Sequence, residues 1–143
     1  MANLILSRKQ RMVVTAGVMM GMFLAALEAT VVGTAMPTVI AALGGLQHYS
    51  WVFSAYLLTS TVTVPIWGKL SDLYGRRPLY QIGIAIFLAG SILSGISHSM
   101  FQLIAFRAIQ GLGAGALVPL AMTIIGDIYT LQERARMQAL FSG

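Results

Sequence analysis

Two charged residues, Glu28 and Arg107, each lie well inside a long apolar stretch of the sequence. A charge at the centre of a membrane helix costs about 2.5 to 3.5 kcal/mol on insertion scales, so such residues usually face the interior of a helical bundle. A carboxylate can bind and release a proton, and a guanidinium can pair with it. We interpret both residues as candidates for proton or solute movement. The alternative is a buried ion pair that only fixes helix packing.

Small residues accompany both charges at helical spacing. The face of Glu28 carries Gly17, Gly21 and Ala35, and the face of Arg107 carries Gly111, Ala114 and Val118. Small residues let membrane helices approach closely, so we expect both charges to point into the bundle. Gly111 and Gly115 are interpreted as a helix-packing motif rather than as a hinge.

A second group of charges lies at 68–78, between two long apolar segments, where a membrane protein places a cytoplasmic hairpin. Its residues are Gly68, Lys69, Asp72, Gly75, Arg76, Arg77 and Pro78. Gly68 is expected to let another helix approach closely. Gly75 can adopt the left-handed conformation that ends a helix, and Pro78 fits the first turn of the next helix. The alternative is that the basic residues only determine topology.

The composition of the chain indicates the environment of the elements that carry these charged groups. Hydrophobic residues make up 57 % of the chain and charged residues 9 %, whereas soluble domains carry about 25 % charge. The chain is therefore expected to lie in a lipid bilayer. Its net charge of +5 does not indicate nucleic acid, because the basic residues form short separated clusters rather than one face. There is no cysteine, and no pattern of metal ligands, phosphate loop or nucleophile with base; we expect neither a cofactor nor an enzyme.

Four apolar segments are long enough to span a hydrocarbon core, which needs roughly 20 helical residues. They cover 12–36, ending at Pro37, then 50–69, 79–97 and 100–126, and a fifth begins at 137–143. The first segment could be a secretory signal, but it is longer than a signal's apolar region and no Ala-x-Ala site follows. The sequence thus predicts an all-α integral membrane protein.

The orientation follows from the positions of Lys and Arg, which gather on the cytoplasmic side. They occur before the first span, after the second and after the fourth, and the two other loops have none. The N-terminus is therefore predicted to be cytoplasmic. At 1.5 Å per residue, Glu28 and Arg107 then lie about 13 Å and about 9 Å below the outer ends of their helices. Their side chains can meet if the two helices face each other.

Pro65 lies inside the second span, where a missing N–H and a ring clash are expected to bend the helix. Thr59, Ser60, Thr61 and Thr63 lie close to it in sequence. Such hydroxyls can satisfy the backbone groups that a proline frees in lipid. We leave two interpretations open: a locally satisfied kink, and a lining of a cavity.

Three segments resemble signatures of the major facilitator superfamily, in the family's order. Residues 68–78 are similar to its loop signature Gly-x-Leu-x-Asp-x-x-Gly-Arg-Arg. Residues 103–115, with Arg107, Gln110 and Gly111, look like its fourth-helix signature. Residues 27–37 are similar to the signature of drug:proton antiporters, especially those with fourteen helices, although they differ at Glu28 and Gly33. Glutamate keeps the carboxylate that proton exchange needs; Gly33 lacks the family's amide.

The resemblance implies a proton-coupled multidrug antiporter of the cell membrane, whose substrate is a small drug-like organic molecule. It implies that Glu28 carries the proton with Arg107 as its electrostatic partner. It also implies that Asp72, Arg76 and Arg77 form a cytoplasmic gate, with a contact between Arg76 and Asp127. Alternatives are a transporter of one specific metabolite, and a small non-transporting membrane protein that binds or oligomerises.

The resemblance covers only part of the family's architecture. Family members have twelve or fourteen helices in two halves, each built from three-helix repeats. The 143 residues are therefore expected to form an incomplete N-terminal transporter domain. A C-terminal half is the expected partner, since a central path for solutes needs both halves.

Overall fold

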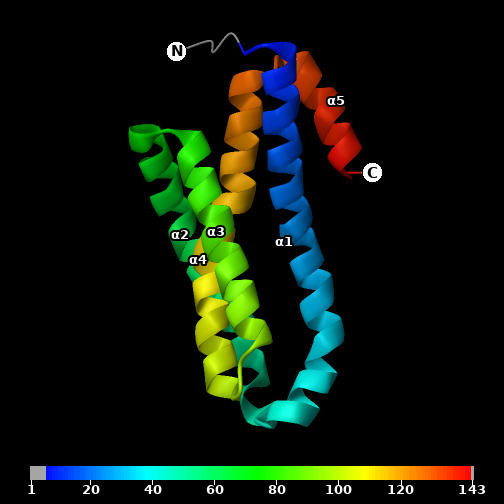
Figure 1. Cartoon of the computed structure of the whole chain (residues 1–143), viewed down its shortest axis with the longest axis vertical. Coiled ribbons are helices and arrows are strands. Elements are labelled where there is room, and N and C mark those ends of the chain that lie inside the picture. The colour runs from blue at the N-terminus through cyan, green and yellow to red at the C-terminus, as the bar shows by residue number, and fades with distance from the viewer. Residues whose placement is uncertain (1–5, 143) are drawn as a thin grey trace.

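The computed structural model describes residues 6–142, and in this range the chain folds into long helices. They are α1 (Arg8–Leu43), α2 (Tyr49–Tyr74), α3 (Arg76–Gly95), α4 (Met100–Ile128) and α5 (Leu131–Ser142), with a short 3₁₀ turn, η1 (Leu46–His48), between α1 and α2. In Figure 1 helices α2, α3 and α4 lie side by side, α1 runs along this group, and α5 turns back beside α1 near the N-terminus.

Helix α4 is the centre of the bundle. It carries the largest set of buried residues, and it packs most extensively on α3 and α2 and less on α1. One apolar cluster is built on Leu117, Leu120 and Ile124 of α4 with Phe87 of α3 and Val18 of α1. Apolar residues are spread around most of the circumference of α4, which suits it to the interior of the bundle, and its buried polar residues, Arg107 and Gln110, have partners there.

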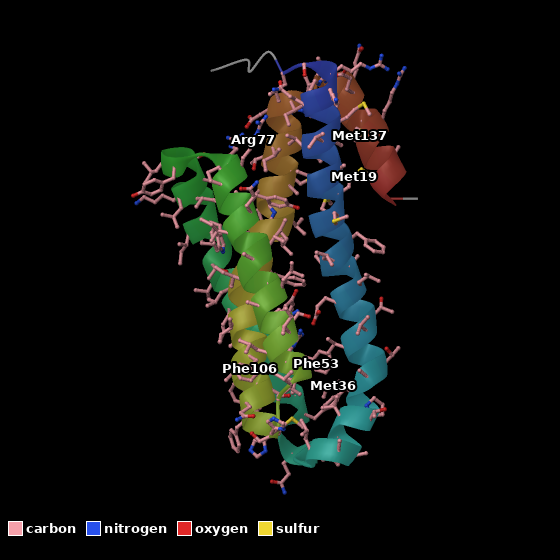
Figure 2. The ribbon with its side chains drawn as sticks, viewed as in Figure 1. Met19, Met36, Phe53, Arg77, Phe106 and Met137 are labelled. Carbon is pink, nitrogen blue, oxygen red and sulfur yellow. The ribbon has the colours of Figure 1, made fainter. Side chains whose placement is uncertain are left out.

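A second apolar cluster lies at the end of the bundle opposite the chain termini. Met36, Val52, Met100 and Leu103 are buried there, and Phe53 packs on them. Figure 2 shows Met36 and Phe53 close to each other between α1 and α2. This cluster joins the loop-side ends of α1, α2 and α4.

The first helix is longer than the span predicted at 12–36. It does not end at Pro37, which lies inside α1, but continues to Leu43. Gly44 and Gly45 follow with φ of 68° and 76°, a backbone conformation that glycine adopts without steric cost. The proline removes one hydrogen bond, whereas the two glycines reverse the chain direction, so the helix ends at the glycines.

The other helices also extend beyond the apolar residues on which the spans were based. Helix α3 begins at Arg76 rather than at 79, and α5 begins at Leu131 rather than near Met137. The predicted end of the fifth segment, Gly143, lies outside the described residues. By length and composition, α1, α3 and α4 can cross a membrane. Helix α2 has sufficient length at 26 residues, but its many Ser and Thr residues lower its hydropathy, so the span at 50–69 stays a prediction.

Candidate functional site

Glu28 and Arg107 form an ion pair between α1 and α4. The side chain of Arg107 is 4 % exposed and that of Glu28 is 12 % exposed. Both charged side chains therefore point into the bundle. Each has lost most of its contact with solvent and is paired with the other instead. The two side chains thus meet, as the similar depth of Glu28 and Arg107 in their helices allowed.

Gln110 joins the two charges into a closed triangle. Its Oε1 accepts a hydrogen bond from Arg107 Nη1 at 2.8 Å, and its Nε2 donates one to Glu28 Oε2 at 2.9 Å. The side chain is 1 % exposed. Gln110 lies in segment 103–115, which resembles the family's fourth-helix signature, but it is not among the site residues predicted from the sequence. Its position three residues after Arg107, which places both on one helical face, is the signal that could have found it.

Helix α2 supports the guanidinium of Arg107 from a third direction. The ring of Tyr56 lies under it, with 4.2 Å between Cζ of Arg107 and the ring centroid. Arg107 Nε donates to the carbonyl of Val52 at 3.4 Å. A cation over an aromatic face is stabilised by the ring quadrupole, more strongly where water is excluded. The geometry thus holds Arg107 in place independently of Glu28.

Glycines on α4 allow the neighbouring helices to come this close. A Cβ at Gly111 would lie 2.5 Å from the carbonyl oxygen of Tyr56, and one at Gly115 would lie 2.6 Å from that of Ser60. On the α3 side, a Cβ at Gly90 would lie 2.6 Å from the backbone of Gln110. Contacts this short do not occur between real atoms, so α2 and α3 can touch α4 only because these positions lack side chains.

The two glycines on the face of Glu28, Gly17 and Gly21, differ in how closely other residues pack against them. A Cβ at Gly21 would meet the Tyr80 side chain, whose hydroxyl donates to the carbonyl of Val18 at 2.9 Å. A Cβ at Gly17 would meet no other atom within 4 Å. The expectation of close packing therefore holds at Gly21. It is wrong at Gly17 within the described residues, because Gly17 is exposed while its neighbours Thr15 and Val18 are buried, so its face of α1 points away from the other described helices.

Arg76 forms the centre of the charge group at the other end of α2 and α3. It makes an ion pair with Asp127 of α4, lies 3.7 Å from Asp72, and donates to the carbonyl of Thr123 at 3.3 Å. Gly75 has φ of 95° and separates α2 from α3. The structure therefore brings Asp72, Arg76 and Asp127 together.

Two other members of the 68–78 group lie apart. Arg77 is exposed, and within residues 6–142 it makes no ion pair; Figure 2 shows it at the end of α3 that lies near the chain termini. A Cβ at Gly68 would meet no atom within 4 Å. The expectation that Gly68 allows close helix approach is therefore wrong within the described chain, because its face of α2 is not covered by α3 or α4.

A further polar cluster connects the start of α1 to the turn between α4 and α5. Arg11 pairs with Glu133 at 3.1 Å and lies over the ring of Tyr129, with 4.6 Å to the centroid. The Tyr129 hydroxyl lies 2.6 Å from that of Thr15. The hydrogen bond from the Thr130 backbone N–H, followed by those from the Thr130 hydroxyl and Arg11, lowers the pKa of Glu133.

This cluster was not predicted from the sequence. We call it the N-terminal clasp and define it by Arg11, Thr15, Tyr129 and Glu133. Thr130 and Glu133 have the spacing of a capping box, in which each side chain reaches the other residue's backbone N–H. Both bonds are present, at 2.9 Å and 3.5 Å. This spacing could have predicted the start of α5 at Leu131.

The comparisons with known proteins agree with one another. A multidrug transporter protein MdtP of Bacillus subtilis is 48 % identical over 134 residues, which are 94 % of this chain and 25 % of the relative. Multidrug resistance protein 3 of Bacillus subtilis is 44 % identical over 90 % of this chain and 25 % of its own length. Efflux pump dotC of Dothistroma septosporum is 40 % identical over 89 % of this chain and 22 % of its length.

The chain thus spans about a quarter of the length of the curated relatives it matches. No solved structure matches it. The sequence model that describes the Major Facilitator Superfamily matches residues 18–143, which include α2 to α4 and most of α1. The chain is an all-α, multi-pass membrane protein and belongs to the Major Facilitator Superfamily.

Proposed function

We propose that the chain is the N-terminal part of a proton-coupled multidrug efflux transporter of the cell membrane, with its N-terminus in the cytoplasm. The observation that carries the proposal is the buried triangle of Glu28, Arg107 and Gln110. The names of the relatives, a multidrug transporter and an efflux pump among them, support the substrate class. The alternation of basic and uncharged loops supports the orientation.

Glu28 is the proton carrier in this proposal. When ionised, its carboxylate pairs with Arg107 and accepts from Gln110. Protonation removes the charge and leaves Arg107 buried with only neutral partners. Leaving a buried charge uncompensated is strongly destabilising, so protonation favours a rearrangement of α1 against α4. A change of helix positions driven by one proton is the step that a proton-coupled transporter needs.

The group of Asp72, Arg76 and Asp127 is the proposed cytoplasmic gate, to which Arg77 contributes charge. Its ion pairs are partly exposed, with side-chain exposures of 31 % for Arg76 and 53 % for Asp127. Exposed pairs are worth only about 0 to 1 kcal/mol. Such a group can bias a conformational equilibrium without locking the transporter in one state.

The partners in the proposal are the lipid bilayer, protons, a small drug-like organic substrate and the remainder of a longer transporter. The chain covers about a quarter of its relatives, and a central solute path needs two helical halves. In proteoliposomes with an imposed proton gradient, the 143 residues alone are therefore expected to move no ethidium above empty vesicles. Gradient-dependent accumulation by the chain alone would favour a self-assembling oligomer.

The test of the proposed function uses everted membrane vesicles that contain the product of the complete reading frame. A proton gradient is established, and the internal pH and the ethidium content are followed together. Addition of ethidium should release protons from the vesicles, and dye uptake should stop when a protonophore collapses the gradient. Dye movement that does not respond to the gradient would contradict proton coupling, and movement of one metabolite but no dyes would favour the specific-transporter alternative.

A further inference from the structure

Helix α1 is held on the bundle by separate contacts along its length. Its buried residues are Thr15, Val18 and Gly21 in the first half and Met36 near the far end. Between Gly21 and Met36, the described polar contacts of α1 with another helix are those of Glu28. The first half of α1 is therefore held independently of the segment that carries Glu28.

Tyr80 of α3 contacts the first half of α1. Its side chain is buried, and its hydroxyl donates to the carbonyl of Val18 at 2.9 Å. Gly21 makes this approach possible, because a Cβ there would clash with the hydroxyl of Tyr80. Helix α3 packs mainly on α4 and α2, so Tyr80 links α1 to an element that belongs to the rest of the bundle.

The two ends of α1 are held by different kinds of interaction. In the first half, the hydroxyls of Thr15 and Tyr129 lie 2.6 Å apart in the N-terminal clasp, in addition to the bond from Tyr80. A buried polar group that loses its partner carries a desolvation cost. Near the far end, Met36 makes apolar contacts with Val52, and apolar side chains can slide without leaving a polar group unpaired. The first half of α1 therefore resists displacement more than the far end does.

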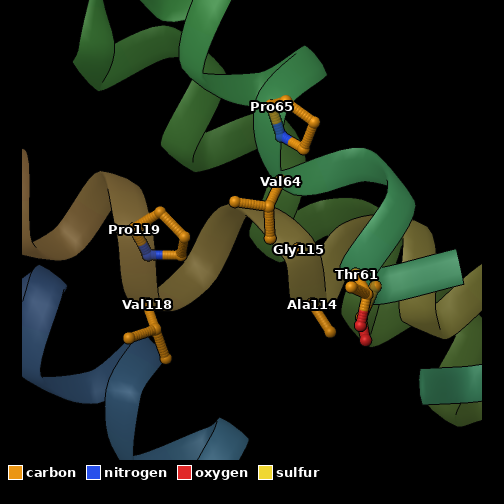
Figure 3. Close-up of a pocket in the computed structure, with 8 residues that line it drawn as sticks. Thr61, Val64, Pro65, Ala114, Gly115, Val118 and Pro119 are labelled. Carbon is orange, nitrogen blue, oxygen red and sulfur yellow. The ribbon is translucent and has the colours of Figure 1, made fainter. Parts of the chain in front are cut away.

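Helices α2 and α4 form a surface against which α1 can move. A groove of about 370 Å³ runs between them, and Figure 3 shows Val64 of α2 and Gly115 of α4 in its lining. No described residue of α1 lines this groove. The close approach of α2 to α4 at Gly111 and Gly115 also does not involve α1. A shift of α1 therefore leaves the contact between α2 and α4 in place.

We propose that Tyr80 is a positioning residue for the proton step. Its bond to Val18 holds the first half of α1 while the segment that carries Glu28 moves relative to Arg107. Val18 lies ten residues before Glu28, about 15 Å along the helix, so loss of charge at Glu28 bends or tilts the second half of α1 rather than shifting the whole helix. The inference rests on the proposed function, because it states which part of α1 responds when Glu28 becomes neutral.

The test measures distances between pairs of spin labels on the chain in lipid nanodiscs, since the chain has no cysteine of its own. Met20→Cys with Ile82→Cys forms the first-half pair, and Val31→Cys with Ile92→Cys forms the second-half pair. All four positions are exposed, and the reference label of each pair is on α3. Glu28→Gln keeps the size of the side chain but not its charge, so it represents the protonated state.

The expected result is a different response of the two pairs. In Glu28→Gln the second-half distance should change by about 2 Å, the size of helix shifts in switching proteins, and the first-half distance should not change. Addition of Tyr80→Phe should make the first-half distance change as well, whereas Tyr80→Phe with Glu28 intact should change neither. A tyrosine with only a structural role would have the same effect in both backgrounds.

Three outcomes would overturn the proposal. They are a first-half distance that changes in Glu28→Gln while Tyr80 is intact, a first-half distance that stays fixed in the double variant, and no change of either distance. Tyr74→Phe is the matched control, because it removes the hydroxyl of an exposed tyrosine at the end of α2. Circular dichroism checks that every variant remains helical.

A substitution on the other side of the contact gives an independent test. Gly21→Ala displaces the hydroxyl of Tyr80 and should act as Tyr80→Phe does in the Glu28→Gln background. Gly17→Ala is its control, since a Cβ at Gly17 meets no other atom within 4 Å. Equal first-half distances in the two alanine variants would contradict the role of Tyr80.

Transport by the complete reading frame separates this inference from the proposed function. In everted vesicles Tyr80→Phe should lower the maximal rate of gradient-driven efflux by up to about tenfold, the effect of one hydrogen bond, at an unchanged dye concentration for half-maximal rate. A changed half-maximal concentration at an unchanged maximal rate would contradict a positioning role.

The two proposals can fail separately. Gradient-driven efflux that is unaffected by Glu28→Gln would remove the proton mechanism, whereas a first-half distance released only by Tyr80→Phe would still support the role of Tyr80. Loss of efflux in Glu28→Gln, together with label distances that do not depend on Tyr80, would keep the antiporter and remove Tyr80 from its mechanism.

Discussion

The amide nitrogen of Gln110 donates to Oε2 of Glu28 at 2.9 Å, across the interface of α4 and α1, while its carbonyl oxygen accepts from Arg107. The two bonds fix which end of the amide faces each charge. A carboxylate cannot replace the glutamine without setting two negative charges against each other, and an apolar side chain leaves both charges with fewer partners. The amide therefore sets the relative positions of the proposed proton carrier and its counter-charge.

Replacement of Glu28 with glutamine should abolish proton-driven efflux in the complete transporter while folding and substrate binding are retained. Glutamine keeps the size of the side chain and an oxygen that can accept from Arg107, but it cannot exchange a proton. Efflux is measured in everted vesicles and binding in detergent. Glu133→Gln is the matched control, because Glu133 lies in the N-terminal clasp, away from the buried triangle. Unchanged efflux in Glu28→Gln, or loss of the folded protein, would leave only the packing role.

Arg76 and Asp127 should be energetically coupled. The single variants Arg76→Ala and Asp127→Ala remove the same ion pair, so the double variant should lose less transport than the sum of the two losses. The coupling is expected to be within about 1 kcal/mol, as for other exposed pairs. Lys69→Ala provides the comparison, because Lys69 is exposed, lies outside the proposed gate and makes no ion pair within residues 6–142. Additive losses for Arg76 and Asp127 in the transport assay would show that the pair has no role in the gate.

Alanine at Gly113 should destabilise the bundle. A Cβ there would clash with the backbone of Phe87 and would lie 2.5 Å from the carbonyl oxygen of Gly83, so α3 must move away from α4. The expected loss is about 1 to 3 kcal/mol in the free energy of unfolding, the usual cost of overpacking. Unfolding is followed in detergent by circular dichroism. The control is Gly33→Ala, since a Cβ at Gly33 meets no atom within 4 Å; equal effects of the two variants would contradict this packing.

The N-terminal clasp should weaken in acid. Hydrogen bonds from Thr130 and Arg11 hold the pKa of Glu133 below its ordinary value of 4.5. A lowered pKa means that the folded state favours the ionised form, so the contribution to stability is present above pH 4.5 and is lost as the pH falls through the lower, folded-state pKa. The measurement compares thermal midpoints of wild type and Glu133→Gln between pH 7 and pH 3. The small advantage of the wild type should disappear at the acidic end, and an advantage that grows there would contradict the assignment.

The orientation can be decided by cysteine labelling, because the chain has no cysteine of its own. Leu46 and Tyr74 are suitable sites, being 69 % and 71 % exposed at opposite ends of α2. In intact cells an impermeant thiol reagent should label Leu46→Cys, and it should label Tyr74→Cys only after permeabilisation. The reverse pattern would place the N-terminus outside.

Features that depend only on residue type and helical spacing could be predicted from the sequence. Glu28 and Arg107 were placed at similar depths by helix rise alone, and their side chains meet. The expectations failed where residues far away in the sequence determine whether a position is packed or exposed. Gly68 and Gly17 have the spacing of packing glycines, but within residues 6–142 no atom lies within 4 Å of a Cβ built at either position. Near Pro65, the hydroxyls of Thr59 and Thr63 donate to carbonyls of their own helix, and both interpretations of this segment, a locally satisfied kink and a cavity lining, stay predictions.

The ends of the helices were also predicted incorrectly. Counting apolar residues cannot show that charged residues continue a helix, so Arg76 and Leu131 were not recognised as helix starts. Pro37 was taken as a terminator, although the conformational freedom of Gly44 and Gly45 ends α1. Gln110 was quoted in the fourth-helix resemblance but was not assigned to the site, because an amide has no net charge to mark it in an apolar segment. Its distances to both charged groups show its role in the structure.

Helix α4 carries Arg107 and Gln110 on one part of its surface and meets α2 through Gly111 and Gly115, and α3 through Gly113. Each residue of an α-helix advances the side chains by about 100° around the axis. A single inserted or deleted residue between Arg107 and Gly111 would therefore turn the glycine faces away from α2 and α3 if the charges stayed in place. Natural length variation in this protein and its relatives should consequently be confined to the loops that flank α4.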